Sequence, residues 1–273
     1  MEGPWASLMR ELLANVFERL PFDERLKTVP LVCKDWRTAS QDPICWRDVD
    51  MEPWIKARRE SDYGWEFDCK EELEDVVKLV VDRSQGQLRR LRTMFSSNES
   101  VHYIAENCPL LIDLSISESF LVEDESALLL AENCRRLETL DLSDCYLLTT
   151  RSIEMFGKNC CSLISFSRNM LRTHECTAKD LPNGDEEAVA IGSHMRALKQ
   201  LELKKLTSLT DFGLMQIATG CKNVESLNIA CCSGVSPSAM EKVSTMCSKL
   251  KAFVKPINPR LTVNQKLIWM LFD

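Results

Sequence analysis

Thirteen cysteines in a chain of 273 residues are the first candidates for chemistry, because thiols can hold a metal, form disulfides or act as nucleophiles. No Cys-x-x-Cys pair occurs, and His102, His174 and His194 lie far apart, so the ligand spacing of a zinc site is missing. His174-Glu175-Cys176 is the only local group of metal donors, and neighbouring residues of an extended loop point in different directions. We therefore expect no metal site and no cofactor.

Catalytic motifs are missing as well. The chain contains no phosphate-binding G-x-x-x-x-G-K-[ST], no dinucleotide-binding G-x-G-x-x-G, no H-E-x-x-H and no G-x-S-x-G. Paired carboxylates occur, but the sequence shows no apolar pocket that would shift their pKa values. A nucleophilic cysteine would need a histidine beside it. The sequence therefore predicts a protein that is not an enzyme and has no catalytic residue.

The overall charge excludes several classes of partner. The chain carries 34 Lys and Arg residues against 41 Asp and Glu residues, a net charge of −7, which argues against nucleic acid or an anionic membrane as the main partner. No apolar run approaches the roughly 18 residues that span a bilayer. The opening residues Met1-Glu2-Gly3-Pro4-Trp5 lack the pattern of a secretory signal. We therefore expect a protein of the nucleus or cytoplasm, or both, whose thiols stay reduced.

An internal repeat accounts for most of the cysteines. The segment Asn107-Cys108-Pro109-Leu110-Leu111-Ile112-Asp113-Leu114 is echoed by Asn133-Cys134-Arg135-Arg136-Leu137-Glu138-Thr139-Leu140, and further copies follow. The first core position of each copy falls at residues 111, 137, 163, 198, 224 and 250, in steps of 26, 26, 35, 26 and 26. A period of 26 with an L-x-x-L-x-L pattern is typical of leucine-rich repeats, in which each repeat forms one strand and one helix.

Seven cysteines occupy two fixed positions of this repeat. Five lie three residues before the first core position, and two lie three residues after the last apolar residue of the strand. They are Cys108, Cys134, Cys160, Cys221 and Cys247, and then Cys145 and Cys232. A small, weakly polar thiol suits a tight turn, where it packs as a hydrophobe. The pattern over residues 85–255 resembles the cysteine-containing class of leucine-rich repeats, so we interpret these thiols as packing residues.

The first fifty residues lie outside the repeat. Apolar residues at helical spacing predict an amphipathic helix over residues 7–20, which Pro21 ends. The segments Leu8-Met9-Arg10-Glu11-Leu12-Leu13, Val16-Phe17, Leu20-Pro21, Val32-Cys33-Lys34-Asp35-Trp36 and Cys45-Trp46 together resemble an F-box over residues 1–50. Met9-Arg10 replaces the proline that usually follows the first leucine. The resemblance implies docking on a Skp-type adaptor through Leu8, Leu12, Leu13, Val16, Phe17, Leu20, Pro21, Leu26, Val29, Val32, Cys33 and Trp36.

An F-box followed by these repeats resembles the F-box/leucine-rich-repeat substrate receptors of SCF-type ubiquitin ligases, and most of all a plant subgroup. The resemblance implies an adaptor that connects the chain to a cullin and a RING subunit, and repeats that hold an unknown target protein for ubiquitination and degradation. Two alternatives remain open, a non-ligase scaffold that binds the adaptor and a small-molecule receptor. Six or seven repeats form only an open arc, which argues against a deep ligand pocket.

The expected fold is α/β, with an N-terminal helical F-box and an open solenoid that has parallel strands on its concave face and helices on its convex face. Residues 51–84 are expected to form a junction whose helix, over residues 70–81, covers the N-terminal end of the stack. Gly86 ends that helix and Leu88 begins the first strand. Residues 256–273 are expected to form a C-terminal cap.

The concave face is the expected binding surface for the target. Alternation along each strand points the apolar residues inward and short polar residues outward. The same polarity would arise on any strand that simply faces solvent. The outward residues are Ser115, Thr139, Asp141, Ser143, Ser165, Ser167, Gln200, Glu202, Lys204, Ser226 and Asn228.

The repeat breaks after Phe166. Arg168 stands where neighbouring repeats have leucine, so it is either paired or turned outward at Ser167, because an unpaired buried guanidinium costs several kcal/mol. A step of 35 in place of 26 inserts nine residues near 170–187, and the acidic, Pro and Gly content predicts an exposed loop over 171–187. We expect Arg168, Asn169 and this loop to rim the concave face and contact the target. The alternative is an insertion without a function.

Overall fold

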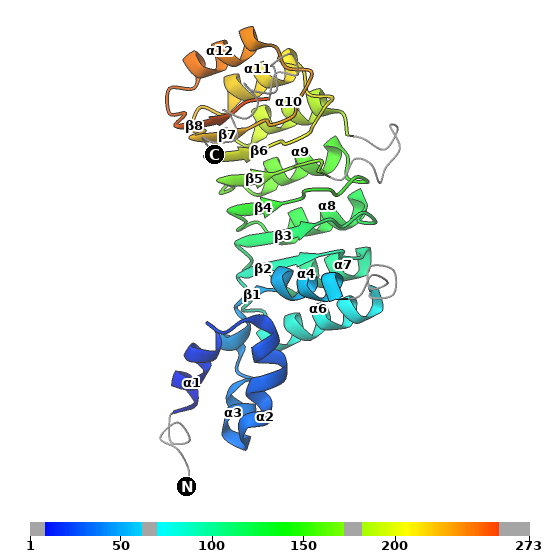
Figure 1. Ribbon diagram of the computed structural model, residues 1–273, viewed down its shortest axis with the longest axis vertical. Helices are drawn as coiled ribbons and strands as arrows, with labels where there is room; N and C mark the ends of the chain where they lie inside the picture. The colour runs from blue at the N-terminus through cyan, green and yellow to red at the C-terminus, as the bar shows by residue number, and fades with distance from the viewer. Residues whose placement is uncertain (1–8, 62–69, 172–181, 257–273) are drawn as a thin grey trace.

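The computed structural model describes residues 9–61, 70–171 and 182–256, which form a helical N-terminal end and one long parallel sheet (Figure 1). The sheet has eight strands in chain order, so each strand pairs with its neighbours in sequence. The strands are β1 (Asp48–Asp50), β2 (Arg90–Met94), β3 (Asp113–Ser117), β4 (Thr139–Asp141), β5 (Ser165–Ser167), β6 (Gln200–Glu202), β7 (Ser226–Asn228) and β8 (Ala252–Val254).

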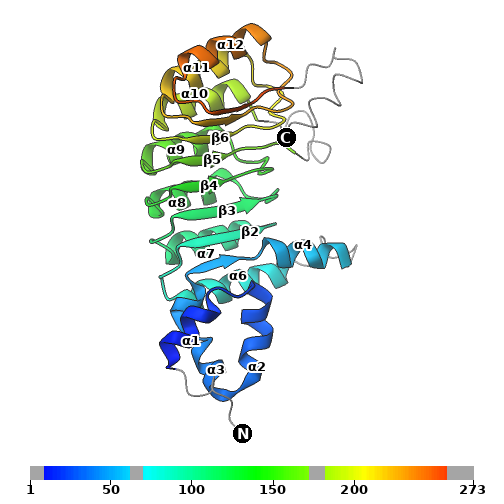
Figure 2. The ribbon, with the colours of Figure 1, turned by 60° about the vertical axis from the view of Figure 1, so that its left-hand side comes forward.

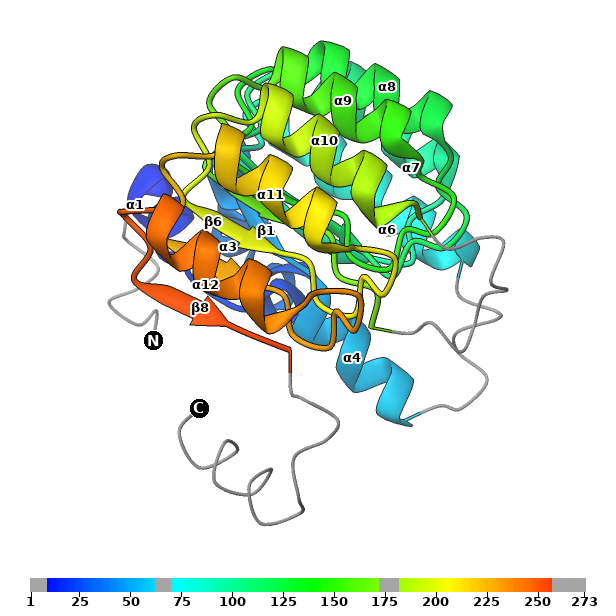
Figure 3. The same cartoon turned by 90° about the horizontal axis from the view of Figure 1, so that it is seen from above.

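One helix follows each strand from β2 to β7 and lies on the same side of the sheet (Figure 3). These helices are α7 (Asn98–Asn107), α8 (Asp124–Asn133), α9 (Thr150–Asn159), α10 (Gly184–His194), α11 (Asp211–Gly220) and α12 (Pro237–Met246). The result is an open leucine-rich-repeat solenoid with helices on its convex side and strands on its concave side. The predicted fold class is therefore confirmed.

The register of the sheet explains why the repeat folds this way. One row across the strands is apolar throughout, running from Leu91 through Leu114, Leu140, Phe166, Leu201 and Leu227 to Phe253. All of these except the half-buried Phe253 are at most 1% exposed. Since side chains of a strand alternate between its two faces, the row points toward the helices and the residues on either side of it point away.

The helices of successive repeats are joined by a ladder of side-chain caps. Asp124, at the start of α8, accepts hydrogen bonds from the backbone N–H and hydroxyl of Thr149, which caps α9. Asp211, in α11, accepts the equivalent bonds from Ser236, which caps α12. Each carboxylate thus satisfies backbone groups at the next helix N-terminus that would otherwise lack a partner.

The cysteines at repeat positions form ladders between neighbouring turns. The Sγ of Cys134 donates to the carbonyl of Cys108 at 3.4 Å, and the Sγ of Cys160 donates to that of Cys134 at 3.5 Å. In the second column, the Sγ of Cys145 donates to the carbonyl of Ile116 at 3.3 Å. Burial raises the pKa of each of these three thiols to about 12. They therefore keep their protons and act as packing residues and weak donors.

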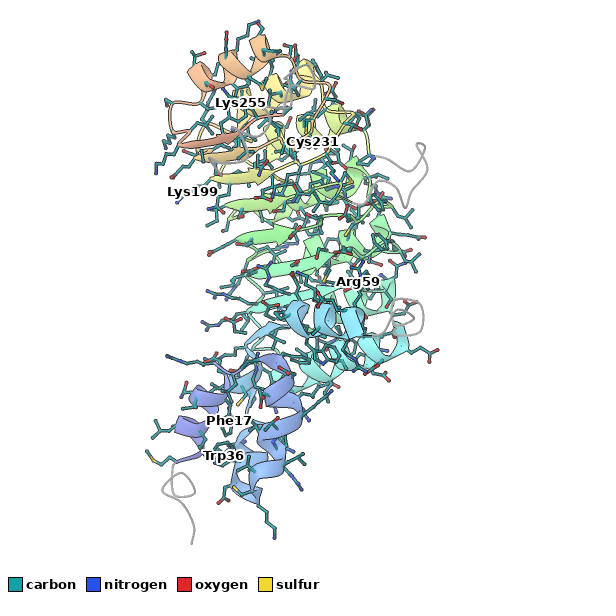
Figure 4. The ribbon with its side chains drawn as sticks, in the orientation of Figure 1. Phe17, Trp36, Arg59, Lys199, Cys231 and Lys255 are labelled. Atoms are coloured by element: carbon teal, nitrogen blue, oxygen red, sulfur yellow. The ribbon has the colours of Figure 1, made fainter. Side chains whose placement is uncertain are left out.

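The helical end consists of several short elements: α1 (Arg10–Phe17), a π-helical turn η2 (Glu24–Thr28), α2 (Val29–Val32), α3 (Lys34–Ala39) and a 3-10 turn η3 (Pro43–Trp46). Phe17 and Trp36 pack at 4.9 Å between ring centroids in its interior (Figure 4). Arg25 is 3% exposed and donates to the carbonyls of Cys45 and Asp48, at 2.6 and 2.8 Å. This guanidinium therefore ties η2 to the first strand of the sheet.

The sheet begins earlier than the sequence predicts. β1, inside the F-box resemblance, pairs with β2, whereas the repeat pattern placed the first strand at Leu88. The helix α4 (Glu52–Ser61) follows β1 and projects from the sheet away from the convex helices (Figure 2). The helix α6 (Lys70–Ser84) is slightly longer than expected, packs on α7 and η3, and ends before Gly86, which has a φ of +75°. Of the expected cap over residues 256–273, only Pro256 lies within the described residues.

No helix within the described ranges is both long and apolar enough to cross a bilayer. Within the same ranges, no group of three or more His, Cys, Asp and Glu side chains could hold a metal ion.

Candidate functional site

The helical end carries large apolar side chains that face solvent. Met9, Leu12 and Val16, at or near α1, are 70%, 47% and 48% exposed. Leu31 and Val32, at the end of α2, are 76% and 55% exposed. We call these five residues the apolar surface of the helical end. Exposed apolar patches of this kind often mark sites where another protein binds.

The predicted docking residues divide between this surface and the interior. Leu12, Val16, Pro21, Val32 and Cys33 are exposed, whereas Leu20, Leu26 and Trp36 are half-buried. Leu8 lies outside the described residues. Three of the predicted contacts are buried and therefore cannot touch a partner directly, namely Leu13, Phe17 and Val29, each at most 2% exposed.

This correction has a simple cause. The helix α1 has two apolar faces, and one of them packs against Trp36 through Phe17. A short helix in a small unit uses one apolar face for its own core. The apolar spacing in the sequence does not tell the residues of that face from those that face solvent. Met9 and Leu31 belong to the exposed apolar surface although the sequence did not predict them as docking residues. Both are large apolar residues within the segment that resembles an F-box, and this signal could have marked them as docking residues.

A hollow of 630 Å³ lies on the concave face of the sheet. It is lined by eight of the eleven outward residues that were expected to bind the target, namely Ser115, Thr139, Asp141, Ser165, Ser167, Gln200, Glu202 and Ser226. Arg92, Asp113, Ile164 and Lys199 complete the lining. Lys204, which follows β6, and Asn228, on β7, are half-buried, and Ser143 is only 5% exposed. The structure thus brings most of the outward strand positions into one surface.

Arg168 does not belong to that surface, which corrects the expectation that it contacts the target. Its side chain is fully buried and pairs with Glu187 at 3.0 Å between Nη2 and Oε1. It also donates to the carbonyls of Leu142, Cys145 and Leu148, at 3.2, 2.7 and 2.9 Å. Of the two alternatives, pairing is the one that the structure adopts, because the inward position demands compensation of the charge.

Glu187 corrects a second expectation. Residues 184–187 were predicted to be part of an exposed loop but form the first turn of α10, and Glu187 is buried. Burial raises the pKa of its carboxyl, and the guanidinium of Arg168 opposes that effect. Leu171 is exposed and Asn183 caps α10, whereas residues 172–181 of the predicted loop lie outside the described residues.

Asn169 is 5% exposed and joins three repeats beneath the concave face. Its Nδ2 donates to the hydroxyl of Ser143 at 3.1 Å and to the Oε2 of Glu202 at 3.2 Å. Its Oδ1 accepts a hydrogen bond from the backbone N–H of Lys204 at 2.8 Å. Asn169 therefore orients Glu202 from below. The sequence had predicted instead that its side chain would contact a partner.

The hollow holds several carboxylates in unequal environments. Glu52, beside it, accepts hydrogen bonds from Arg92 at 3.3 Å and from Ser115 at 3.1 Å. Burial raises the pKa values of Asp113 and Asp141, although the sequence showed no sign of a shift. The Oδ1 of Asp113 is buried and accepts no hydrogen bond from the described residues. The hollow thus combines carboxylates with hydroxyl, amide and cationic groups on one face of the sheet.

Comparison with known proteins adds family information to this geometry. The family model described as F-box-like matches residues 5–52. F-box protein SKIP1 of Arabidopsis thaliana is 32% identical over 261 residues, which cover 92% of this chain and 87% of that protein. F-box/LRR-repeat protein 19 of Arabidopsis thaliana is 39% identical over 274 residues, which cover 95% of this chain and 90% of that protein. A chain in the solved Rad7–Elc1 complex of yeast is similar at a TM-score of 0.31 and 17% identity, over 74% of this chain and 70% of that one.

Proposed function

This chain belongs to the plant F-box/leucine-rich-repeat proteins, and we propose that it is the substrate-recognition subunit of an SCF-type ubiquitin ligase. Members of this family are typically receptors without catalytic activity of their own. In the proposed role the chain binds a target protein and holds it near the subunits that transfer ubiquitin. Its contribution to the reaction is proximity, since holding two reactants together removes the entropic cost of their encounter.

The helical end is proposed to dock on a Skp-type adaptor and, through it, to connect the chain to a cullin and a RING subunit. The F-box-like match over residues 5–52 implies adaptor binding in general. The single observation that carries the proposal is the apolar surface of the helical end, whose five residues lie within that match. Burying them against the helices of a partner would remove a large apolar area from water.

The concave face is proposed to bind the target. Eight of the residues that the sequence assigned to this role line one continuous hollow, together with two cations, one carboxylate and one apolar side chain. A protein surface with mixed polar groups around a depression suits a protein ligand better than a small molecule, because small-molecule sites are mostly apolar and enclosed. The target is proposed to leave the complex ubiquitinated and bound for degradation.

The adaptor interaction can be tested by co-purification with a plant Skp-type adaptor. We expect the wild-type chain to retain the adaptor and the double variant Val16→Glu, Leu31→Glu to lose it, because a buried unpaired carboxylate opposes docking. Phe212→Glu is the matched control, since Phe212 is also exposed, at 57%, but lies on α11 in the repeats. Undiminished adaptor binding by the double variant would overturn the proposed docking surface.

The receptor role can be tested by trapping the target. A chain that lacks residues 9–47 but keeps the sheet from β1 onward should accumulate bound target in plant cells, because it can no longer deliver that target to the ligase. The trapped protein should carry fewer ubiquitin chains and turn over more slowly than in cells with the intact receptor. If its ubiquitination and turnover do not change, the chain is an adaptor-binding scaffold rather than a substrate receptor.

A further inference from the structure

The hollow on the concave face has a floor of short side chains. The register places Thr139 beside Ser165, and Asp141 beside Ser167, on the neighbouring strands β4 and β5. Strand β6 follows with Gln200 and Glu202 in the same two rows. The two serines of β5 are therefore flanked on both sides by longer side chains, so a ligand side chain can approach the backbone between them.

Two carboxylates stand on either side of this floor. Asp141 and Glu202 occupy the same row and are separated by one strand, which carries Ser167 between them. Neighbouring strands lie about 4.8 Å apart, so the two positions are about 10 Å apart along the axis of the solenoid. This is close to the rise of two helical turns, which is about 10.5 Å over seven residues.

Both carboxylates are fixed in place and still have acceptor capacity. The Oδ1 of Asp141 accepts from the backbone N–H of Ser143 at 2.9 Å. The Oε2 of Glu202 accepts from Asn169 at 3.2 Å and pairs with the Nζ of Lys204 at 3.0 Å. The other oxygen of each carboxylate accepts no hydrogen bond from a described residue. A rigid acceptor loses little freedom when a donor arrives, which favours binding.

The charged side chains that line the hollow are two cations and three carboxylates, so negative charge is in excess. Arg92, at one end, is already compensated by Glu52 at 3.3 Å. Lys199 lies at the sheet margin in Figure 4, at the edge of the hollow that it helps to line. Asp113 adds a third carboxylate whose buried Oδ1 has no donor within the described residues. A buried acceptor without a donor costs free energy, so a ligand that supplies the missing hydrogen bond is bound more favourably.

We propose that this hollow binds a basic segment of the target protein, with Asp141 and Glu202 receiving two lysine or arginine side chains about 10 Å apart. The proposal rests on the proposed function and specifies the chemistry of the target. Arginine fits these positions well, because its planar guanidinium offers several donors to a carboxylate and can also reach neighbouring hydroxyls. The net charge of −7 favours the approach of such a segment.

A defined probe tests this proposal. The full chain, in complex with its adaptor, is titrated against a fluorescent alanine-based helical peptide that carries arginines at positions i and i+7, and binding is followed by anisotropy. The same peptide with glutamates at those positions is the control probe. We expect the arginine probe to bind more tightly, and the variant Asp141→Asn, Glu202→Gln to bind it about tenfold more weakly because two charge-assisted contacts are lost.

A matched variant separates this site from a general effect of charge. Glu106→Gln, Glu132→Gln removes two carboxylates from exposed positions of α7 and α8 on the convex side, and should leave binding of the arginine probe within about twofold. Equal binding of the two probes, or an equal loss in both double variants, would overturn the proposal. Since adaptor binding is measured on the same samples, a failure of the docking proposal is distinguishable from a failure here. If the adaptor does not bind, the full chain alone is titrated with the same probes, and the same outcomes apply.

Discussion

Arg168 and Glu187 form an ion pair in which neither side chain is exposed to solvent, with 3.0 Å between Nη2 and Oε1. One residue directly follows β5 and the other lies in the first turn of α10. The pair therefore joins the two sides of the longest repeat, where the spacing changes from 26 to 35 residues. It replaces the apolar contact that a leucine makes at this position in other repeats.

Removing one member of this pair should destabilise the protein strongly. Arg168→Leu leaves the buried Glu187 without its partner, so we expect the free energy of unfolding to fall by about 3–5 kcal/mol. The double variant Arg168→Leu, Glu187→Leu should recover part of this loss, because it removes both charges but still deprives the carbonyls of Leu142, Cys145 and Leu148 of the guanidinium donor. Urea denaturation measures both values. The exposed pair of Lys158 and Glu154 is the control, and Lys158→Ala should change stability by less than about 1 kcal/mol. Additive losses in the double variant would contradict the coupling.

Val16 and Phe17 are neighbours in sequence with opposite roles, and their variants should respond in opposite ways. Phe17 is 1% exposed, so Phe17→Ala should lower the free energy of unfolding by about 3–5 kcal/mol. Val16 is 48% exposed, so Val16→Ala should change it by no more than about 0.5 kcal/mol while weakening adaptor binding. Thermal unfolding and adaptor co-purification, measured on the same samples, check the two effects. A large loss of stability in Val16→Ala would place this side chain in the core.

The thiols should differ sharply in their reactivity. Cys33, Cys161 and Cys231 are exposed, whereas burial raises the pKa of Cys108, Cys134 and other repeat thiols to about 12. Because the thiolate is the reactive form, brief alkylation of the folded protein with iodoacetamide should label the three exposed residues and spare the repeat thiols. Peptide mass spectrometry identifies the labelled sites, and the urea-unfolded protein serves as the control. Rapid labelling of Cys134 in the folded protein would contradict its place in the ladder.

Asp211 should make stability depend on acid pH. Hydrogen bonds from the hydroxyl and then the backbone N–H of Ser236 hold the pKa of this carboxyl below its usual value of about 3.9. A lowered pKa in the folded state stabilises the protein above the unfolded pKa, and this stabilisation is lost as the pH falls through the folded pKa. Asp211→Asn, which does not titrate, should therefore lose less stability than wild type between about pH 5 and pH 3. Melting temperatures at the two pH values measure the difference. Glu241→Gln, at an exposed position of α12, should behave as wild type.

The periodic part of the fold was predictable because the same apolar pattern recurs in every repeat. Leu114, Leu140, Leu201 and Leu227 recur at fixed spacing, so the strands and the row that they bury followed from the sequence. β1 was not predictable, since Asp48-Val49-Asp50 is too short to carry a pattern and pairs only because β2 lies beside it. Local sequence contains no information about such a partner.

The candidate sites were predictable to a lesser degree. Outward strand positions such as Thr139 and Gln200 followed from alternation and do line the hollow. Which apolar residues of α1 face solvent depends on where Trp36 packs, and this is a property of the assembled unit. The pairing of Arg168 was foreseen as one of two possibilities, but its partner was assigned to a loop. Glu187 reaches it only because α10 begins before that residue.

The hydrogen bonds between β1 and β2 have a mechanical consequence. Since the strand that closes the helical end is also the first strand of the repeats, no flexible linker separates these two parts of the described chain. In the proposed ligase, the bound target would therefore lie at a fixed distance from the helical end, set by the number of strands between β1 and the hollow. Each added or deleted repeat would move the bound target by about one strand spacing, close to 5 Å, and so change which lysines of the target meet the activated ubiquitin.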